Sequence, residues 1–162
     1  MDEARVAISE PWFPAQIDLR VGSTEGLDLP LVPNTWAVGP DGWEWLWLGP
    51  DEWLAASSDG TSKALIAELE RALDGRHRSI VDVGAGRAVI DLAGEGRFEL
   101  LSHGCGIDLH PRSWTAGMCA QTLLARVPVI LQERGDATRV FVRPSFAEWL
   151  RTWIGDRVAD LS

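Results

Sequence analysis

The strongest constraint on the fold lies between residues 36 and 57, where two Gly-Pro-Asp turns separate short apolar runs. The first turn, GPDG at 39–42, has proline in its second position and glycine in its fourth, which is the chemistry of a tight reverse turn. A similar turn, GPDE, follows at 49–52. Between the turns every second residue is a tryptophan: Trp43, Trp45 and Trp47. This alternation puts the three rings on one face of an extended strand, so the segment predicts short strands joined by tight turns.

The rest of the chain predicts further short strands and three helices. Strand-like runs occupy residues 4–9, 15–21, 79–93, 119–134 and 138–143. The clearest helix covers 61–74, where apolar residues recur on one stripe and Gly75 is placed to end the helix. The last helix begins with a capping box formed by Ser145 and Glu148, and a shorter helix is expected over 96–104. This mixture of strands and helices predicts an α+β chain.

Length and charge limit the organisation and the partners. We expect a single domain over residues 1–162, with room for two lobes at about 1–58 and 59–162. The formal net charge of −9 argues against nucleic acid, because phosphate binding depends on a basic patch. No apolar run is long enough to span a bilayer, and the first thirteen residues do not resemble a signal peptide. Two cysteines make no disulfide framework, so we expect a soluble cytoplasmic protein without a membrane partner.

Residues 80–94, IVDVGAGRAVIDLAG, look like the glycine-rich loop of a dinucleotide- or S-adenosylmethionine-binding fold. That loop uses three glycines, but the third position is occupied here by Ala88. A long helix should follow, whereas the next residues alternate like a strand, and the remaining chain is too short for the missing strand–helix units. We therefore expect a strand–turn–strand hairpin, in which Gly84 and Gly86 form a tight turn and bind no phosphate.

Several potential metal ligands gather in the following region: His103, Cys105, Asp108, His110 and Cys119. Zinc sites use such side chains, but this spacing matches none of the usual structural pairs. Cys119 begins an apolar run and is interpreted as a small buried thiol. Nothing in the sequence points to an activated thiolate at Cys105. We assign no metal and no catalytic residue here, and the role of His103, Cys105 and Cys119 stays open.

Several motifs in one order resemble the gamma subunit family of heterotetrameric sarcosine oxidase. The matching elements are LGPDEWL at 48–54, the Gly86-Arg87 turn, GCGIDLHP at 104–111, the strand that begins at Gly117, and SFAEWL at 145–150. The resemblance covers roughly residues 30–157. It implies an α+β fold of antiparallel sheets with helices packed on one face, like that of the glycine-cleavage T-protein and its folate-binding relatives.

The resemblance also implies a function. The family enzyme is a flavoprotein of four subunits that oxidatively demethylates sarcosine. FAD, NAD and tetrahydrofolate belong to its large alpha subunit, FMN lies between the alpha and beta subunits, and zinc belongs to the small delta subunit. The gamma subunit is a structural partner with no cofactor of its own. We therefore expect a chain without catalytic, cofactor-binding or metal-binding residues.

A structural subunit needs surfaces that its partners cover, and the nine tryptophans of this chain supply candidates. The candidates are Trp43, Trp45 and Trp47 on the expected strand and Trp149 and Trp153 on the last helix. The strand triplet suits a core face and an inter-subunit face equally well. The helix stripe is interpreted first as core. An exposed triplet in an isolated chain would form a large apolar patch and would require a partner.

Two other functions compete with that of a structural subunit. One is a stand-alone folate-dependent one-carbon protein of the T-protein type, although no carboxylate for a pterin ring can be assigned. The other, ranked last, is a small S-adenosylmethionine-dependent methyltransferase. The sequence does not identify which N-methyl amine a complex would oxidise, because specificity would reside in another chain.

Overall fold

The computed structural model describes residues 5–160, which form two compact units. The inserted unit contains Phe13–Gly86. The discontinuous unit joins the chain up to Trp12 with the chain from Arg87 onward. Residues 57–61, where the sequence suggests a boundary between lobes, connect a strand to a helix inside the inserted unit.

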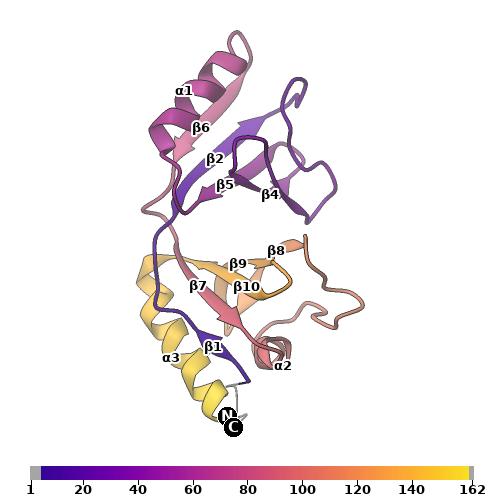
Figure 1. Ribbon diagram of the computed structural model, residues 1–162, viewed down its shortest axis with the longest axis vertical. Helices are drawn as coiled ribbons and strands as arrows, with labels where there is room; N and C mark the ends of the chain where they lie inside the picture. Colours follow the sequence, from indigo (N-terminus) through magenta and orange to yellow (C-terminus); the bar gives the residue numbers. More distant parts are fainter. Residues whose placement is uncertain (1–4, 161–162) are drawn as a thin grey trace. The chain divides into compact units, whose positions relative to one another are not determined.

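The inserted unit is a five-stranded sheet with one helix. Its elements are β2 (Ala15–Val21), β3 (Trp36–Val38), β4 (Glu44–Gly49), β5 (Glu52–Ser57), α1 (Ser62–Ala72) and β6 (Arg78–Asp82). The strand order is β3-β4-β5-β2-β6, and all neighbouring strands are antiparallel. Helix α1 lies along one face of this sheet (Figure 1).

Turn chemistry and period-two alternation explain this sheet. The β3–β4 turn closes with a hydrogen bond from the Gly39 N–H to the Trp43 carbonyl, and Gly42 adopts a φ of 80° that favours glycine. On the face toward α1, cross-strand register pairs Trp47 of β4 with Trp53 of β5. The helix adds Leu65, Leu69 and Leu73 to the same buried cluster. The predicted alternation of the tryptophans is therefore confirmed, and it builds the core of the unit.

The discontinuous unit is a second five-stranded antiparallel sheet with two helices. Its elements are β1 (Ala7–Ile8), β7 (Ala88–Ala93), α2 (Arg97–Ser102), β8 (Cys119–Leu124), β9 (Val127–Glu133), β10 (Ala137–Val142) and α3 (Pro144–Asp160). The order is β1-β7-β10-β9-β8. Helix α3 packs on β7 and buries Ala147, Leu150 and Ile154 (Figure 1). Both units together confirm the predicted α+β class.

Two local predictions need correction in this unit. The run at 119–134 is not one strand but a hairpin, because Ala125 and Arg126 both take positive φ values of 49° and 68°. Two consecutive left-handed residues make the turn whose twist matches antiparallel strands. The last helix begins at Pro144, so Ser145 is not its cap. Proline suits the first helical position because its missing N–H would have no partner there.

The glycine-rich stretch also differs from its prediction. The predicted turn is present, with a hydrogen bond of 2.8 Å from the Gly86 N–H to the Val83 carbonyl. The predicted hairpin is wrong, because β6 pairs with β2 whereas β7 pairs with β1 and β10. Each strand pairs with strands that lie far away in sequence. The turn at Gly84–Gly86 therefore ends the inserted unit and returns the chain to the discontinuous one.

A buried ion pair holds the discontinuous unit together. Arg97 at the start of α2 donates to the Glu133 carboxylate at 2.8 Å and to the Gly135 carbonyl at 2.7 Å. The two side chains are only 8% and 1% exposed. Thr138 on β10 also donates to the Glu133 carboxylate. The pair ties α2, β9 and β10 together.

Among the described residues, no helix combines the length and apolar character needed to cross a membrane.

Candidate functional site

The five tryptophans proposed as interface candidates occupy different environments. Trp43 and Trp45 are only 5% and 3% exposed, and they pack in the core of the inserted unit. Trp47 on β4 and Trp153 on α3 are half-buried. Trp149 on α3 is 51% exposed. A buried ring offers little surface to another protein, so the strand tryptophans act as core and the candidates for a surface lie on α3.

A groove of about 530 Å³ lies beside these helix tryptophans on the discontinuous unit. We call it the aromatic groove; it is lined by residues 102–106, Ala125, Arg126, Trp149 and Trp153. It therefore combines the end of α2, the tight turn between β8 and β9, and one side of α3. Phe146, 40% exposed, precedes Trp149 by one helical turn and extends the apolar surface of α3.

Close backbone packing positions the groove. The Ala125 N–H donates to the Gly104 carbonyl at 2.9 Å, joining the β8–β9 turn to the segment after α2. A Cβ atom on Gly104 would lie 2.7 Å from Cη2 of Trp153, so only glycine lets the ring approach the backbone. The Arg157 guanidinium lies 5.9 Å from the centre of the Trp153 ring. These contacts fix the orientation of Trp153.

The lining of the aromatic groove contains a cation, Arg126, but no carboxylate. Arg126 and His103 contribute the ionisable side chains with basic character. Arg126 is exposed, and no carboxylate within residues 5–160 forms an ion pair with it. The groove can therefore accept an apolar segment that carries an acidic group.

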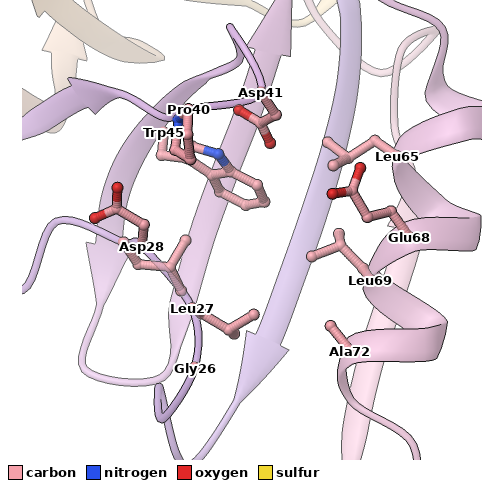
Figure 2. A pocket seen from close by; sticks show the side chains of 11 residues that line it. Gly26, Leu27, Asp28, Pro40, Asp41, Trp45, Leu65, Glu68, Leu69 and Ala72 are labelled. Atoms are coloured by element: carbon pink, nitrogen blue, oxygen red, sulfur yellow. The ribbon is translucent and has the colours of Figure 1, made fainter.

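A second cavity, of about 360 Å³, belongs entirely to the inserted unit. We call it the acidic cleft; it is lined by residues 26–29, Pro40, Asp41, Trp45, Leu65, Glu68, Leu69 and Ala72. Figure 2 shows its two walls, with Leu65, Glu68 and Leu69 on α1 facing Trp45 and the loop around Asp28. The floor is apolar and the rim carries three carboxylates. The sequence did not predict this cavity, because its residues come from four separate segments of the chain.

The potential metal ligands are spread over the discontinuous unit. His103 and Cys105 line the aromatic groove, and the Cys105 thiol lies 3.7 Å from the Thr122 hydroxyl. Cys119 is fully buried in β8, as expected of a small apolar thiol. Within the part of the chain that the structure describes, no three His, Cys, Asp or Glu side chains are close enough together to hold a metal ion.

The GIDLHP block, residues 106–111, contains a turn in which side chains accept hydrogen bonds from the backbone. The Asp108 carboxylate accepts a hydrogen bond of 3.0 Å from the His110 N–H. Hydrogen bonds from the Ser113 side chain and from this N–H lower the pKa of Asp108 below its ordinary value. Asp108 and His110 therefore serve the local backbone, and the structure does not bring them together with His103 or Cys105.

Comparison with known proteins identifies a matching protein family. Residues 6–160 match the family model described as sarcosine oxidase, gamma subunit family. The sarcosine oxidase subunit gamma of Corynebacterium sp. strain U-96 is 33% identical over an alignment of 171 positions. The alignment covers 99% of this chain and 82% of that protein. The subunit gamma of Corynebacterium sp. strain P-1 is 34% identical over 138 residues, covering 85% and 67%.

A solved structure supports the same family assignment. A chain of the heterotetrameric sarcosine oxidase from Corynebacterium sp. U-96, in complex with pyrrole 2-carboxylate, superposes with a TM-score of 0.88 at 32% identity. The match covers 99% of this chain and 87% of that one. The glycine cleavage system aminomethyltransferase T from Bartonella henselae gives a TM-score of 0.65 at 12% identity, covering 94% and 46%. This second likeness concerns the fold alone and confirms the expected T-protein-like architecture.

Proposed function

This chain belongs to the sarcosine oxidase gamma subunit family, and from that membership we propose that it is the non-catalytic subunit of a heterotetrameric, flavin-dependent oxidase. The complex oxidatively demethylates sarcosine or a related N-methyl amino acid. The partners are alpha, beta and delta subunits, and these chains carry the FAD, FMN, NAD, tetrahydrofolate and zinc. The proposed compartment is the cytoplasm.

The observation that carries this proposal is the exposed aromatic surface of α3. Trp149 is 51% exposed and Phe146 is 40% exposed, beside a groove of about 530 Å³. Aromatic residues are enriched at the centres of protein interfaces, and tryptophan is frequent among the residues that dominate binding. A surface tryptophan next to a hollow is a typical anchor for a partner chain. Sarcosine oxidase of Corynebacterium sp. U-96 is itself a heterotetramer.

Co-expression with tagged alpha, beta and delta subunits tests the proposal. We expect the wild-type chain to co-purify with the flavin-bearing partners in equal molar amount. The double variant Phe146→Ala/Trp149→Ala should weaken this association about thirtyfold or more, because even one aromatic anchor contributes roughly 2 kcal/mol or more at an interface centre. Phe13→Ala is the matched control, because Phe13 is 57% exposed, belongs to the inserted unit and does not line the aromatic groove.

Two results would overturn the proposal. One is a wild-type chain that stays monomeric and is not taken up by the partner subunits. The other is full uptake of the double variant, which would show that the α3 surface is not the interface.

A further inference from the structure

The tight turn between β8 and β9 places an arginine in the wall of the aromatic groove. Ala125 and Arg126 both have left-handed φ angles in this turn. The Ala125 N–H donates to the Gly104 carbonyl at 2.9 Å, and a β-bridge joins Leu124 to Cys105. The backbone of Arg126 is therefore held against the segment that follows α2, and its side chain lines the groove.

Arg126 lacks the counter-ion that other arginines of the discontinuous unit have. Arg97 pairs with Glu133 at 2.8 Å, and Arg139 pairs with Asp91 at 2.9 Å. The Arg126 side chain is exposed and has neither an ion pair nor a hydrogen bond with any residue in 5–160. Within that range, no aspartate or glutamate lines the groove either. This wall of the groove therefore carries a positive charge with which no described carboxylate pairs.

The wall that α3 contributes to the groove is aromatic. Trp149 is exposed, and Trp153, one helical turn later, is half-buried against Gly104. Phe146, one turn before Trp149, continues the exposed aromatic surface. Apolar surroundings strengthen an ion pair, because they lower the effective dielectric around the two charges. An occupant with a carboxylate next to an apolar side chain would use both the guanidinium and the aromatic rings.

The size and chemistry of the groove favour a polypeptide segment over other occupants. Its volume of about 530 Å³ is large enough for several side chains. A small anion would use the Arg126 guanidinium alone and would leave the rings of Phe146 and Trp149 uncovered. A second copy of this chain is disfavoured, because each copy carries a net charge of −9 and like charges repel.

We propose that the aromatic groove binds a segment of a partner subunit in which an aspartate or glutamate is flanked by apolar residues. The carboxylate pairs with the Arg126 guanidinium, which offers two parallel N–H groups. The apolar side chains pack on Trp149 and Trp153. The ion pair supplies specificity, because apolar contacts alone accept many partners. The inference rests on the proposed function, since it takes the partner to be another subunit of the complex.

The first test reverses the charge of Arg126 in the full chain, co-expressed with tagged alpha, beta and delta subunits. Arg126→Glu should be taken up about tenfold or more weakly, because two carboxylates would then face each other. Arg126→Lys keeps the charge and should restore most of the uptake. Neither new side chain is branched at Cβ, so both tolerate the left-handed turn about equally.

Arg112→Glu is the matched control for the charge reversal. Arg112 is exposed, belongs to the same unit and does not line the groove, and its substitution changes the net charge by the same amount. We expect this variant to be taken up like the wild-type chain. Equal losses in the two glutamate variants would overturn the proposal by showing only a general effect of net charge, and so would full uptake of Arg126→Glu.

Zero-length cross-linking tests the ion pair without relying on a loss of binding. Lys63 is the only lysine in the sequence, so Arg126→Lys adds a single reactive amine to the groove. A carbodiimide joins an amine to a carboxylate when the two groups are in contact. After digestion of the assembled complex, mass spectrometry should find the lysine of Arg126→Lys joined to an aspartate or glutamate with apolar neighbours in a partner subunit. Arg112→Lys should not form this link.

The outcomes separate this inference from the proposed function. A complex that assembles normally but gives no link from the lysine of Arg126→Lys to a partner carboxylate would overturn the inference and leave the proposed function intact. A link to a second copy of this chain would overturn the assignment to a partner subunit. A wild-type chain that the partner subunits do not take up would overturn the proposed function itself, and with it the partner named here.

Discussion

The two units use the same architecture but place their aromatic rings differently. Each is a five-stranded antiparallel sheet packed against a helix. In the inserted unit the helix meets buried tryptophans, including Trp45 and Trp53, and the rings fill the core. In the discontinuous unit Trp149 and Phe146 lie on the outer side of α3 and stay exposed. The tryptophans therefore occupy two environments, a buried core in the inserted unit and an exposed helix face in the discontinuous unit.

The units also differ in how they use charge. Arg97 and Glu133 form a buried pair in the discontinuous unit. The inserted unit has ion pairs with at least one exposed partner, such as Arg78 with Glu70, whose side chain is 47% exposed. Buried pairs are costly to break and exposed pairs contribute little. Breaking the buried pair should therefore lower the free energy of unfolding more than breaking an exposed pair of the inserted unit.

The largest expected effect tests the contrast between the tryptophans. Trp53→Ala should lower the free energy of unfolding by about 3–5 kcal/mol, because it removes a fully buried ring and leaves a cavity. The lost hydrogen bond to the Pro30 carbonyl adds roughly 1 kcal/mol. Trp149→Ala should change stability by about 0.5 kcal/mol or less, because its ring is half-exposed. Urea unfolding of the two variants measures both values, and equal losses would contradict the distinction between core and surface tryptophans.

A slightly smaller effect tests the contrast between the ion pairs. Glu133→Gln removes one charge of the buried pair and leaves the Arg97 guanidinium without its counter-ion, so we expect a loss of about 3–5 kcal/mol. Glu70→Gln makes the same chemical change at the exposed pair with Arg78 and should cost about 1 kcal/mol or less. Urea unfolding compares the two directly. Similar losses would mean that the burial of the Arg97–Glu133 pair has no energetic consequence.

The smallest effect concerns two carboxyl groups with opposite pKa shifts. Burial, followed by the neighbouring Asp18 carboxylate, raises the pKa of Glu52 in the inserted unit. Glu52 therefore contributes stability at acid pH, and that contribution is lost as pH rises through its folded pKa. The pKa of Asp108 in the discontinuous unit is lowered, so its contribution is present above its unfolded pKa and is lost as pH falls through the folded value.

Asp18→Asn isolates the cause of the Glu52 shift. Removing the neighbouring negative charge should lower the pKa of Glu52 toward its ordinary value, while burial keeps part of the shift. The pKa of Asp108 should not change and serves as an internal control in the same experiment. Carbon-detected NMR titration of the side-chain carboxyl groups measures both. An unchanged Glu52 pKa would assign the whole shift to burial.

Local chemistry made much of the fold predictable from sequence. The Gly-Pro-Asp turns and the alternation of Trp43, Trp45 and Trp47 identified β4 and its neighbours, because these signals act within a few residues. What could not be predicted is pairing between distant strands. Nothing near residues 80–94 shows that β6 and β7 pair into different sheets, because their partners lie far away in sequence.

The candidate sites were less predictable for a related reason. Ala125 and Arg126 carry no glycine or asparagine signal, so their left-handed turn stayed hidden inside an apolar run. Without that turn, Arg126 could not be placed beside Trp149 and Trp153. Helical periodicity placed the α3 aromatic residues on one stripe, but the interpretation of that stripe as core is wrong for Trp149, which is 51% exposed. Burial depends on what the sheet covers, which is a property of the folded unit.

The short pairing of β1 with β7 has a consequence for biosynthesis. Ala7 pairs with Ala93, so β1 cannot pair with β7 until the whole inserted unit has been synthesised. The inserted unit is contiguous and can fold first, as domains generally do during translation. Its folding brings the two flanking segments closer together and reduces the entropy lost in closing the long loop between them. The inserted unit can therefore fold during translation before β1 joins the sheet of the discontinuous unit.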